Sequence, residues 1–175
     1  MKIMIIGSPG SGKSTFARKL GTLTKLPIYH LDAYYWRPDW VATPNEDWDL
    51  FMNNLVKEES WIVDGDYNRT LDIRMKEADV IVFFDLPSIM NMYRVIKRRV
   101  QYHGKTRPDR NEGCEEKLDW AFIKWVWSFR RNNRPIIKRK IVEYGSGKKV
   151  IIFRKISDSN KVMQQVEEIG VRGLL

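Results

Sequence analysis

The stretch Gly7-Ser8-Pro9-Gly10-Ser11-Gly12-Lys13-Ser14 fits the pattern G-x-x-x-x-G-K-[ST] and decides the fold predicted for this chain. The apolar run at 2–6 before it predicts a buried strand, and the apolar spacing at 15–23 after it predicts a helix. Glycines let the backbone turn tightly, so that the N–H groups of the loop and the positive end of the helix face an anion. The stretch therefore predicts a phosphate-binding loop.

Residues of this loop have distinct expected roles in binding a nucleotide. Lys13 is expected to reach the β- and γ-phosphates, and the Ser14 hydroxyl to take a place on Mg²⁺. The expected cofactors are ATP and Mg²⁺. The residues predicted to bind the nucleotide are Gly7, Ser8, Pro9, Gly10, Ser11, Gly12, Lys13, Ser14 and Thr15.

The composition indicates one domain over residues 1–175. Of the 175 residues, 43% are hydrophobic, and we find no low-complexity run and no internal repeat. The apolar stretches are far shorter than the roughly 20 residues of a membrane helix, and residues 1–6 lead directly into the glycine loop. The single cysteine, Cys114, excludes an internal disulfide. We therefore expect a soluble, cytoplasmic protein without a membrane partner, either monomeric or homodimeric.

Positive charge is concentrated in the second half of the chain. The formal net charge is +9, but residues 1–90 contain 10 Lys and Arg against 13 Asp and Glu, whereas residues 91–175 contain 21 against 9. Such a surplus suits nucleic acid, an acidic membrane surface, or a small polyanionic substrate held by several arginines. Composition leaves these alternatives open.

Strands and helices alternate along the rest of the chain. Apolar runs predict strands at 26–32, 60–65, 78–87 and 148–153, and helical spacing predicts helices at 46–58, 89–103, 115–144 and 158–168, with a break at Pro135. The run at 78–87 lacks polar alternation, as expected of a strand covered on both faces. The pattern predicts a three-layer α/β/α fold with a five-stranded parallel sheet and a ligand at the carboxyl ends of the strands.

Acidic residues stand at the ends of three predicted strands: Asp32, Asp64 and Asp85. Carboxylates at this edge suit a Mg²⁺-nucleotide site, where they hold the waters of the ion or orient an attacking group. Asp also favours turns and helix caps, and for Asp85 we favour this structural interpretation. For Asp32 and Asp64 we favour a functional one. Strand alternation also places His30 and Asp32 on one side.

The segment 33–44 is rich in aromatic residues and too irregular for a regular element. It contains Tyr34, Tyr35, Trp36 and Trp40. One interpretation is a packed loop, and the other is an aromatic wall for a planar or sugar-like acceptor. Both remain open at this stage.

With these residues placed, the chain resembles the nucleoside-monophosphate-kinase group of P-loop proteins, to which adenylate kinase belongs. The stretch Asp64-Gly65-Asp66-Tyr67-Asn68-Arg69-Thr70 is similar to D-G-F-P-R-T of adenylate kinase with one residue inserted. This resemblance implies that Asp64 serves the Mg²⁺ shell and that Arg69 grips a phosphate of the acceptor. It covers most of residues 1–155.

Two later stretches also resemble this group. Asp85-Leu86-Pro87 followed by Arg94 and Arg98 is similar to D-V-P followed by R-x-x-x-R, which implies Arg94 near the base of ATP and Arg98 near its phosphates. Thr106-Arg107-Pro108-Asp109 resembles the lid segment T-R-x-D, which implies that Arg107 meets the transferring phosphoryl group.

More narrowly, the chain resembles an adenylate-kinase-related group labelled DNA topology modulation proteins. The resemblance lies in His30-Leu31-Asp32 with Trp36-Arg37-Pro38-Asp39-Trp40, and in Gly113-Cys114-Glu115 with Trp125-Val126-Trp127-Ser128-Phe129. It implies that His30 and Trp36 belong to the acceptor side. The segment 28–55 differs from the helical AMP-binding segment of adenylate kinase.

These resemblances imply an ATP-binding phosphotransferase that moves the γ-phosphoryl group to a small acceptor, either a nucleotide or a hydroxylated or anionic metabolite. Lys13 and Mg²⁺ are expected to hold ATP while Arg98 and Arg107 close over it, in a short basic lid at about 101–113. The acceptor-side segment at about 33–58 is expected to be mobile. The cations expected to be merely solvated are Lys97, Arg130, Arg131, Lys138, Arg139 and Lys140.

Two kinds of acceptor remain open. A hydroxyl acceptor benefits from a carboxylate that takes its proton, and Asp32 is the predicted base. Arg69 and Arg74 instead fit an anionic acceptor.

An ATP-binding regulator or ATPase acting on DNA is the alternative function. The basic second half and the interleaved Trp120, Trp125 and Trp127 favour nucleic acid, although these tryptophans recur at helical spacing.

Overall fold

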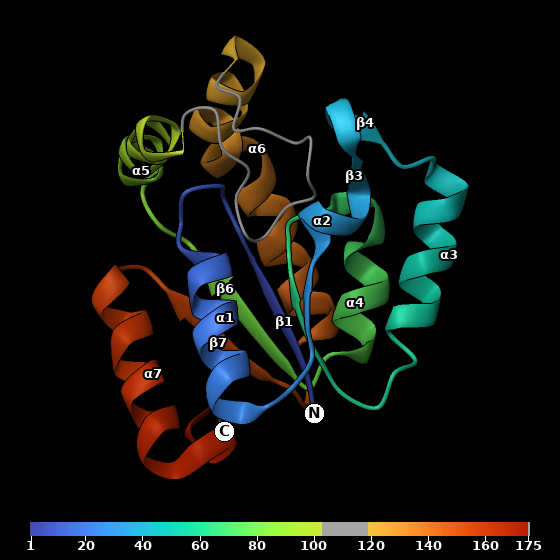
Figure 1. The fold of residues 1–175 in the computed structure, drawn as a ribbon. Helices are drawn as coiled ribbons and strands as arrows, with labels where there is room; N and C mark the ends of the chain where they lie inside the picture. Colours follow the sequence, from blue (N-terminus) through green and yellow to red (C-terminus); the bar gives the residue numbers. More distant parts are fainter. Residues whose placement is uncertain (103–118, 175) are drawn as a thin grey trace.

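The computed structural model describes residues 1–102 and 119–174 (Figure 1). Five strands form the main sheet: β1 (Lys2–Gly7), β2 (Ile28–His30), β5 (Trp61–Asp64), β6 (Val80–Phe84) and β7 (Lys149–Phe153). The α-helices are α1 (Lys13–Thr24), α2 (Leu31–Tyr35), α3 (Asn45–Leu55), α4 (Leu71–Glu77), α5 (Ser88–Gln101), α6 (Trp120–Tyr144) and α7 (Ile156–Ile169). A hairpin of β3 (Trp36–Arg37) and β4 (Val41–Ala42) and short 3₁₀ turns at Pro38–Trp40, Asn68–Thr70 and Gly170–Leu174 complete the described chain.

The main sheet has the order β2-β5-β1-β6-β7, and every neighbouring pair is parallel. This confirms the predicted five-stranded parallel sheet. The chain first builds the β2 and β5 side of the sheet and then crosses over β1 to build the β6 and β7 side. Because ligands of such sheets bind outside the carboxyl ends of the strands where the order reverses, the end of β1 is the expected place for a site.

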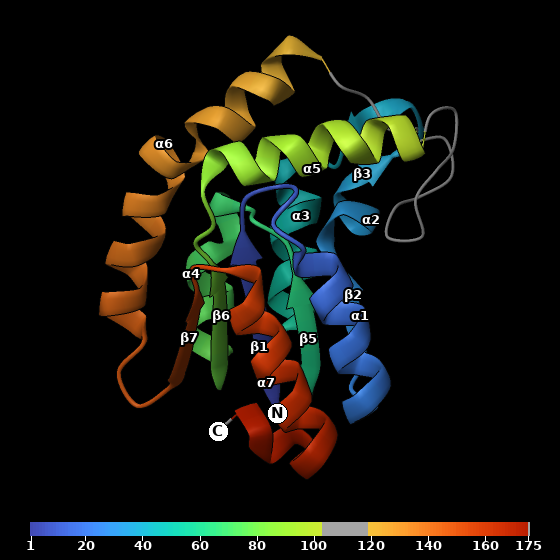
Figure 2. The same ribbon diagram turned by 90° about the vertical axis from the view of Figure 1, so that its left-hand side faces the viewer.

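Helices cover both faces of the sheet (Figures 1 and 2). On one face, Met4 and Ile6 belong to a core with side chains of α3, α4 and α6. On the other face, Ile3 and Ile5 belong to a core with side chains of α1 and α7. Alternate residues of β1 thus enter opposite cores, and burial on both sides explains its continuous apolar run. The arrangement is compatible with the predicted three-layer fold.

The second predicted strand and the loop after it differ from the prediction. The strand stops at His30, and residues 31–35 form α2 in place of the extended chain predicted to 32. The segment 33–44, predicted to lack regular structure, contains the β3–β4 hairpin. Thr43 closes this hairpin, because its backbone N–H and its hydroxyl both donate to the carbonyl oxygen of Tyr35, at 2.9 and 2.8 Å.

The helix α6 continues through Pro135, where a break was predicted. Proline removes one backbone hydrogen bond and crowds the preceding turn, which bends a long helix without ending it when packing holds both halves. Figure 2 shows that α6 changes direction along its length. The same view shows α5 lying across the carboxyl ends of the strands.

Candidate functional site

The glycine loop at 7–14 joins the carboxyl end of β1 to α1, whose first residue is Lys13. Gly7 has a φ of 141°, and a Cβ there would lie 2.7 Å from the carbonyl oxygen of Phe84. Gly10 has a φ of 79°, and a Cβ there would lie 2.4 Å from the carbonyl oxygen of Asn91. The loop therefore wraps closely around the backbone of β6 and α5, which only glycine permits.

A cavity of about 750 Å³ opens beside this loop at the carboxyl ends of the strands. Elements far apart in the sequence form its walls, namely the glycine loop, α2, the β3–β4 hairpin, residues 64–69, α5 and α6. The predicted site residues that line it are Gly7, Pro9, Gly10, Gly12, Lys13, Ser14, Thr15, His30, Asp32, Trp36, Asp64, Arg69, Arg94 and Arg98. Ser8 and Ser11 are buried within the loop. Arg107 and most of the predicted lid lie outside the described residues.

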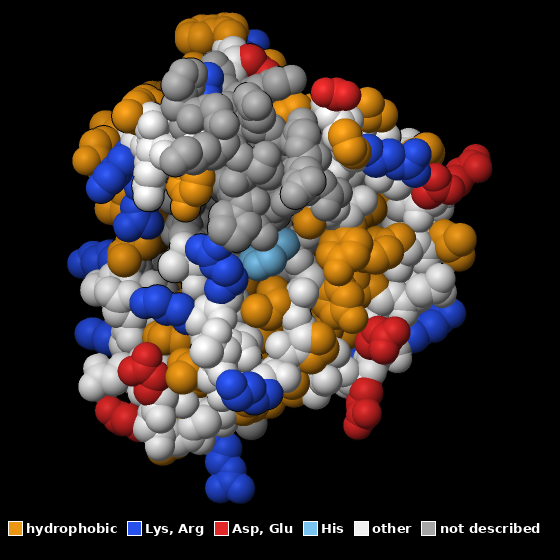
Figure 3. Space-filling view, viewed as in Figure 1, with side chains coloured by type: hydrophobic (Ala, Val, Ile, Leu, Met, Phe, Trp, Pro, Cys, Tyr) orange, Lys and Arg blue, Asp and Glu red, His pale blue; other side chains and the backbone are white. Residues whose placement is uncertain are grey.

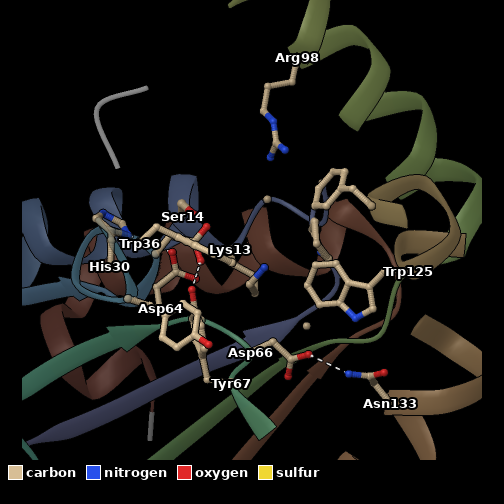
Figure 4. Close-up of a pocket in the computed structure, with 18 of the residues that line it drawn as sticks. Lys13, Ser14, His30, Trp36, Asp64, Asp66, Tyr67, Arg98, Trp125 and Asn133 are labelled. Carbon is tan, nitrogen blue, oxygen red and sulfur yellow. Dashed lines mark hydrogen bonds and ion pairs between the residues drawn. The ribbon is translucent and has the colours of Figure 1, made fainter. Parts of the chain in front are cut away.

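Lys13, Asp64 and Asp66 lie close together at the centre of the cavity (Figure 4). The ammonium group of Lys13 donates a hydrogen bond to the carbonyl oxygen of Ser8 at 3.1 Å. Its positive charge acts to lower the pKa of both carboxyl groups, although burial outweighs it at Asp66. An ammonium group at the start of a helix, beside glycine backbone, is suited to binding a phosphate group.

Asp64 ends β5 and is buried. Burial raises the pKa of its carboxyl, but the hydrogen bond from His30 and the charge of Lys13 outweigh burial, so the pKa lies below its ordinary value. The ring Nδ1 of His30 lies 2.9 Å from Oδ2 of Asp64. Because an ionised carboxylate only accepts hydrogen bonds, Nδ1 carries the proton of this contact.

Asp66 is a cavity residue that the sequence analysis did not single out. Burial raises the pKa of its carboxyl to about 6, against the opposing charges of Lys13 and Arg74. Its Oδ2 accepts a long hydrogen bond of 3.5 Å from Asn133 of α6 (Figure 4), whereas Oδ1 is hidden from solvent and has no hydrogen-bond partner among the described residues. Asp66 could have been predicted from the sequence, because it lies two residues after Asp64, at the end of a predicted strand.

Asp32 reaches the same cavity from α2. The alternation argument that paired it with His30 along a strand was wrong, because the strand has ended by Leu31. The two side chains nevertheless line one cavity, since the first turn of α2 directly follows β2. The hydroxyl of Tyr67 donates a hydrogen bond to Oδ1 of Asp32 at 2.8 Å, and this fixes the carboxylate against the segment after β5.

Aromatic side chains form one wall of the cavity, and they also pack against one another. The ring centroid of Tyr35 lies 4.9 Å from that of Trp36, 5.0 Å from that of Trp48 and 4.7 Å from that of Tyr67, and Trp40 packs edge-on against Trp36 at 5.5 Å. All five residues line the cavity. The aromatic segment is thus packed, as the first interpretation predicted, and it also faces a cavity; its role as a wall for an acceptor stays a prediction.

The two arginines predicted to suit an anionic acceptor are occupied by other groups. Arg69 lines the cavity, but its Nε and Nη2 donate to the two carboxylate oxygens of Asp49 at 2.8 and 2.6 Å. Arg74 is wholly buried and donates to the carbonyl oxygens of Gly65 and Tyr67, both at 2.8 Å. Burial lowers the pKa of Arg74 to about 10. The expectation that Arg74 contacts an acceptor was wrong, since it holds the backbone after β5.

Asp85 anchors α6 to the end of β6. Arg134 donates from Nε to both carboxylate oxygens of Asp85, at 2.7 and 2.9 Å, and Arg130 and Lys138 lie within 4.0 Å. These contacts agree with the structural interpretation of Asp85. Lys140 pairs with Asp72 and is largely buried, so the expectation that Lys140 is merely solvated was wrong.

Ser14 and Asp64 fit the expected Mg²⁺. The nearby Ser14 hydroxyl helps to lower the pKa of Asp64, whose Oδ1 is buried without a hydrogen-bond partner among the described residues. Within residues 1–102 and 119–174, no three side chains of His, Cys, Asp or Glu gather as a complete metal site. Mg²⁺ bound with a nucleotide requires only one or two protein ligands, because phosphates and waters supply the rest.

Two groups of side chains stand out on the face of the molecule that Figure 3 shows. Lys and Arg side chains gather over α1 and α5, whereas hydrophobic side chains gather over α2 and α3 (Figure 3).

A second cavity of about 290 Å³ lies on the far side of the glycine loop, between α1 and α7. It is lined by Ser11, Gly12, Thr15, Phe16, Lys19, Phe84, Arg94, Ile156, Ser159, Asn160 and Met163.

Neither the models of known protein families nor the curated proteins contain a match to this chain. In the described part of the chain, no helix combines the length and the apolar character needed to cross a bilayer.

Proposed function

We propose that this protein is an ATP-dependent phosphotransferase with a P-loop NTPase fold, which transfers the γ-phosphoryl group of ATP to a small acceptor. One observation carries the proposal. The glycine loop and Lys13 stand at the start of α1 and open into a cavity that also contains the carboxylates of Asp32 and Asp64. This combines a phosphate-binding element and a carboxylate base for the acceptor within one cavity.

In this proposal the phosphates of ATP bind along residues 7–14 and the base occupies the second cavity. Phe16, Phe84, Ile156 and Met163 give that cavity apolar walls suited to a flat base. Arg94 lines both cavities, so its guanidinium spans the path from base to phosphates.

Phosphoryl transfer requires alignment and positive charge more than covalent chemistry from the protein. Lys13 would supply charge at the β- and γ-phosphates, and Arg98 points from α5 into the same cavity (Figure 4). Ser14 and Asp64 would hold Mg²⁺, which offsets the phosphate charge when bound. Asp32, held by Tyr67, is positioned to accept a proton from an acceptor hydroxyl.

The test is ADP release from ATP with Mg²⁺, measured with and without candidate acceptors. We expect at least one small acceptor to raise the rate more than about tenfold above background hydrolysis, and Lys13→Ala to abolish this increase. Normal folding of the variant is checked by circular dichroism. Acceptor-stimulated turnover that survives Lys13→Ala would contradict the proposal.

A DNA-dependent ATPase or regulator is a second candidate. Trp120 and Trp127 are 77% and 60% exposed on α6, where helical spacing alone suggested a core position. In this alternative, the exposed Arg131 on the same helix would pair with phosphates while the two indole rings stack on bases. If DNA is the ligand, affinity for duplex or single-stranded DNA should fall by orders of magnitude between about 50 and 200 mM salt. Weak binding at both salt concentrations would rule this candidate out.

A further inference from the structure

We infer that the acceptor is a neutral polyhydroxyl compound with a flat ring or sugar face, a nucleoside or a free sugar, and not a phosphorylated compound. This inference rests on the proposed function and concerns one part of the main cavity, here termed the acceptor half. The acceptor half comprises α2, the β3–β4 hairpin, α3 and residues 64–69, opposite the arginines of α5.

The arginines around the acceptor half already bind protein groups. An acceptor phosphate is usually held by guanidinium groups that bind two of its oxygens. Arg69 makes that two-point contact with Asp49. Arg74 is buried on backbone carbonyl oxygens behind residues 65–67. In the described part of the acceptor half, the charge of Arg69 is therefore offset by Asp49, and Arg74 is buried away from the cavity.

Acidic and amide groups face the cavity in this half. Asp32 and Asp66 line it, as do Asn45 and Asn68. A phosphate monoester carries nearly two negative charges at neutral pH and is repelled by nearby carboxylates. Hydroxyl groups instead donate hydrogen bonds to carboxylates and exchange hydrogen bonds with amides. The buried Oδ1 of Asp66, which has no partner among the described residues, is an acceptor of the kind that a substrate hydroxyl satisfies.

Aromatic faces complete this half. Tyr35, Trp36, Trp40, Trp48 and Tyr67 line the cavity. Flat rings and the C–H faces of sugars pack well against Trp and Tyr. Aromatic walls with carboxylate and amide groups between them match a ring that carries several hydroxyls.

The inferred step balances without another reactant. The acceptor oxygen forms a bond to the γ-phosphorus, and the bond from that phosphorus to the bridging oxygen of ADP breaks. The electron pair of the broken bond leaves with ADP, and the hydroxyl proton passes to the Asp32 carboxylate.

The experiment compares matched pairs of acceptors on the full chain with ATP and Mg²⁺. Adenosine, thymidine, ribose and glucose are each tested beside their monophosphates by ADP release, with Lys13→Ala as the blank. We expect at least one neutral compound to give a kcat/KM at least about tenfold above that of its monophosphate. The nucleoside and sugar arms identify which source is used. A monophosphate preferred by about tenfold would overturn the inference and leave the proposed function intact, whereas no stimulation by any compound would overturn both.

A second measurement tests why phosphorylated compounds are excluded. Asp49→Asn releases the Arg69 guanidinium, and we expect it to lower KM for the monophosphate of the preferred acceptor by about fivefold or more, with little change for the neutral compound. Asp47→Asn, on the same helix, breaks the pair with Arg37, which is not among the described residues that line the cavity, so it is the matched control and should lower neither KM. An unchanged KM in Asp49→Asn would remove the arginine argument and overturn the inference.

Discussion

Replacing Asp85 by Asn should destabilise the fold through one identifiable contact. The Asp85 side chain is only 3% exposed, and both of its oxygens accept from Arg134, at 2.7 and 2.9 Å. The partner is 31% exposed, so part of its charge is screened by water. The contact joins the end of β6 to α6, the helix that carries Asn133 and Trp125 into the cavity.

The expected loss follows from the geometry. A hydrogen bond to a charged group contributes about 1.5–3 kcal/mol, and Asn retains one neutral acceptor in place of two charged ones. With partial screening we expect Asp85→Asn to lower the free energy of unfolding by about 2–3 kcal/mol. For a domain of this size, that loss corresponds to a fall in Tm of roughly 4–12 °C.

The measurement is urea denaturation of four proteins, namely the wild type, Asp85→Asn, Arg134→Met and the double variant. We expect a coupling energy of at least about 1.5 kcal/mol. The control is Asp47→Asn, the same substitution in a pair whose side chains are 60% and 53% exposed, where the loss should stay below about 0.5 kcal/mol. A coupling energy for Asp85 and Arg134 no larger than the loss in this control would refute the reasoning.

Three further predictions concern the cavity. Gly10→Ala should weaken ATP binding about tenfold or more in calorimetry, because its φ of 79° and the Asn91 carbonyl oxygen, 2.4 Å from where the added methyl group would lie, forbid a side chain. Gly147→Ala, with a φ of 75° and nothing within 4 Å, should leave the affinity unchanged. Asp32→Asn should lower kcat about a hundredfold or more while ATP affinity stays within about twofold, and an unchanged kcat would exclude it as the base. Burial raises the pKa of Asp66 from 3.8 to about 6, so its protonated form favours folding. The resulting gain in the free energy of unfolding is fully present below about pH 4 and is lost as the pH rises through about 6. The total change in the free energy of unfolding is about 3 kcal/mol. Asp66→Asn should flatten this pH dependence in urea titrations, and an unaltered dependence would show that Asp66 is not its source.

Much of the fold was readable from local patterns in the sequence. The glycine stretch at 7–14 predicted a strand, a loop and a helix, and all three are present. The apolar run at 78–87 predicted a strand covered on both faces, and β6 is buried throughout. Such predictions succeed because the periods of strands and helices arise within a few residues of chain.

The sequence by itself determined the alternation of strands and helices, the parallel sheet and the edge at which Lys13, Asp32 and Asp64 gather. Only the tertiary structure decided which charged groups face the cavity. The sequence offered no reason to give Arg69 and Arg74 different roles. In the structure, Arg69 pairs with Asp49, whereas Arg74 is buried behind the residues that follow β5. The partners of Asp66 and Asp85, namely Asn133 and Arg134, are 67 and 49 residues away in the sequence. The physical reason is that burial and pairing depend on neighbours brought together by packing, and no local period of the chain encodes those neighbours.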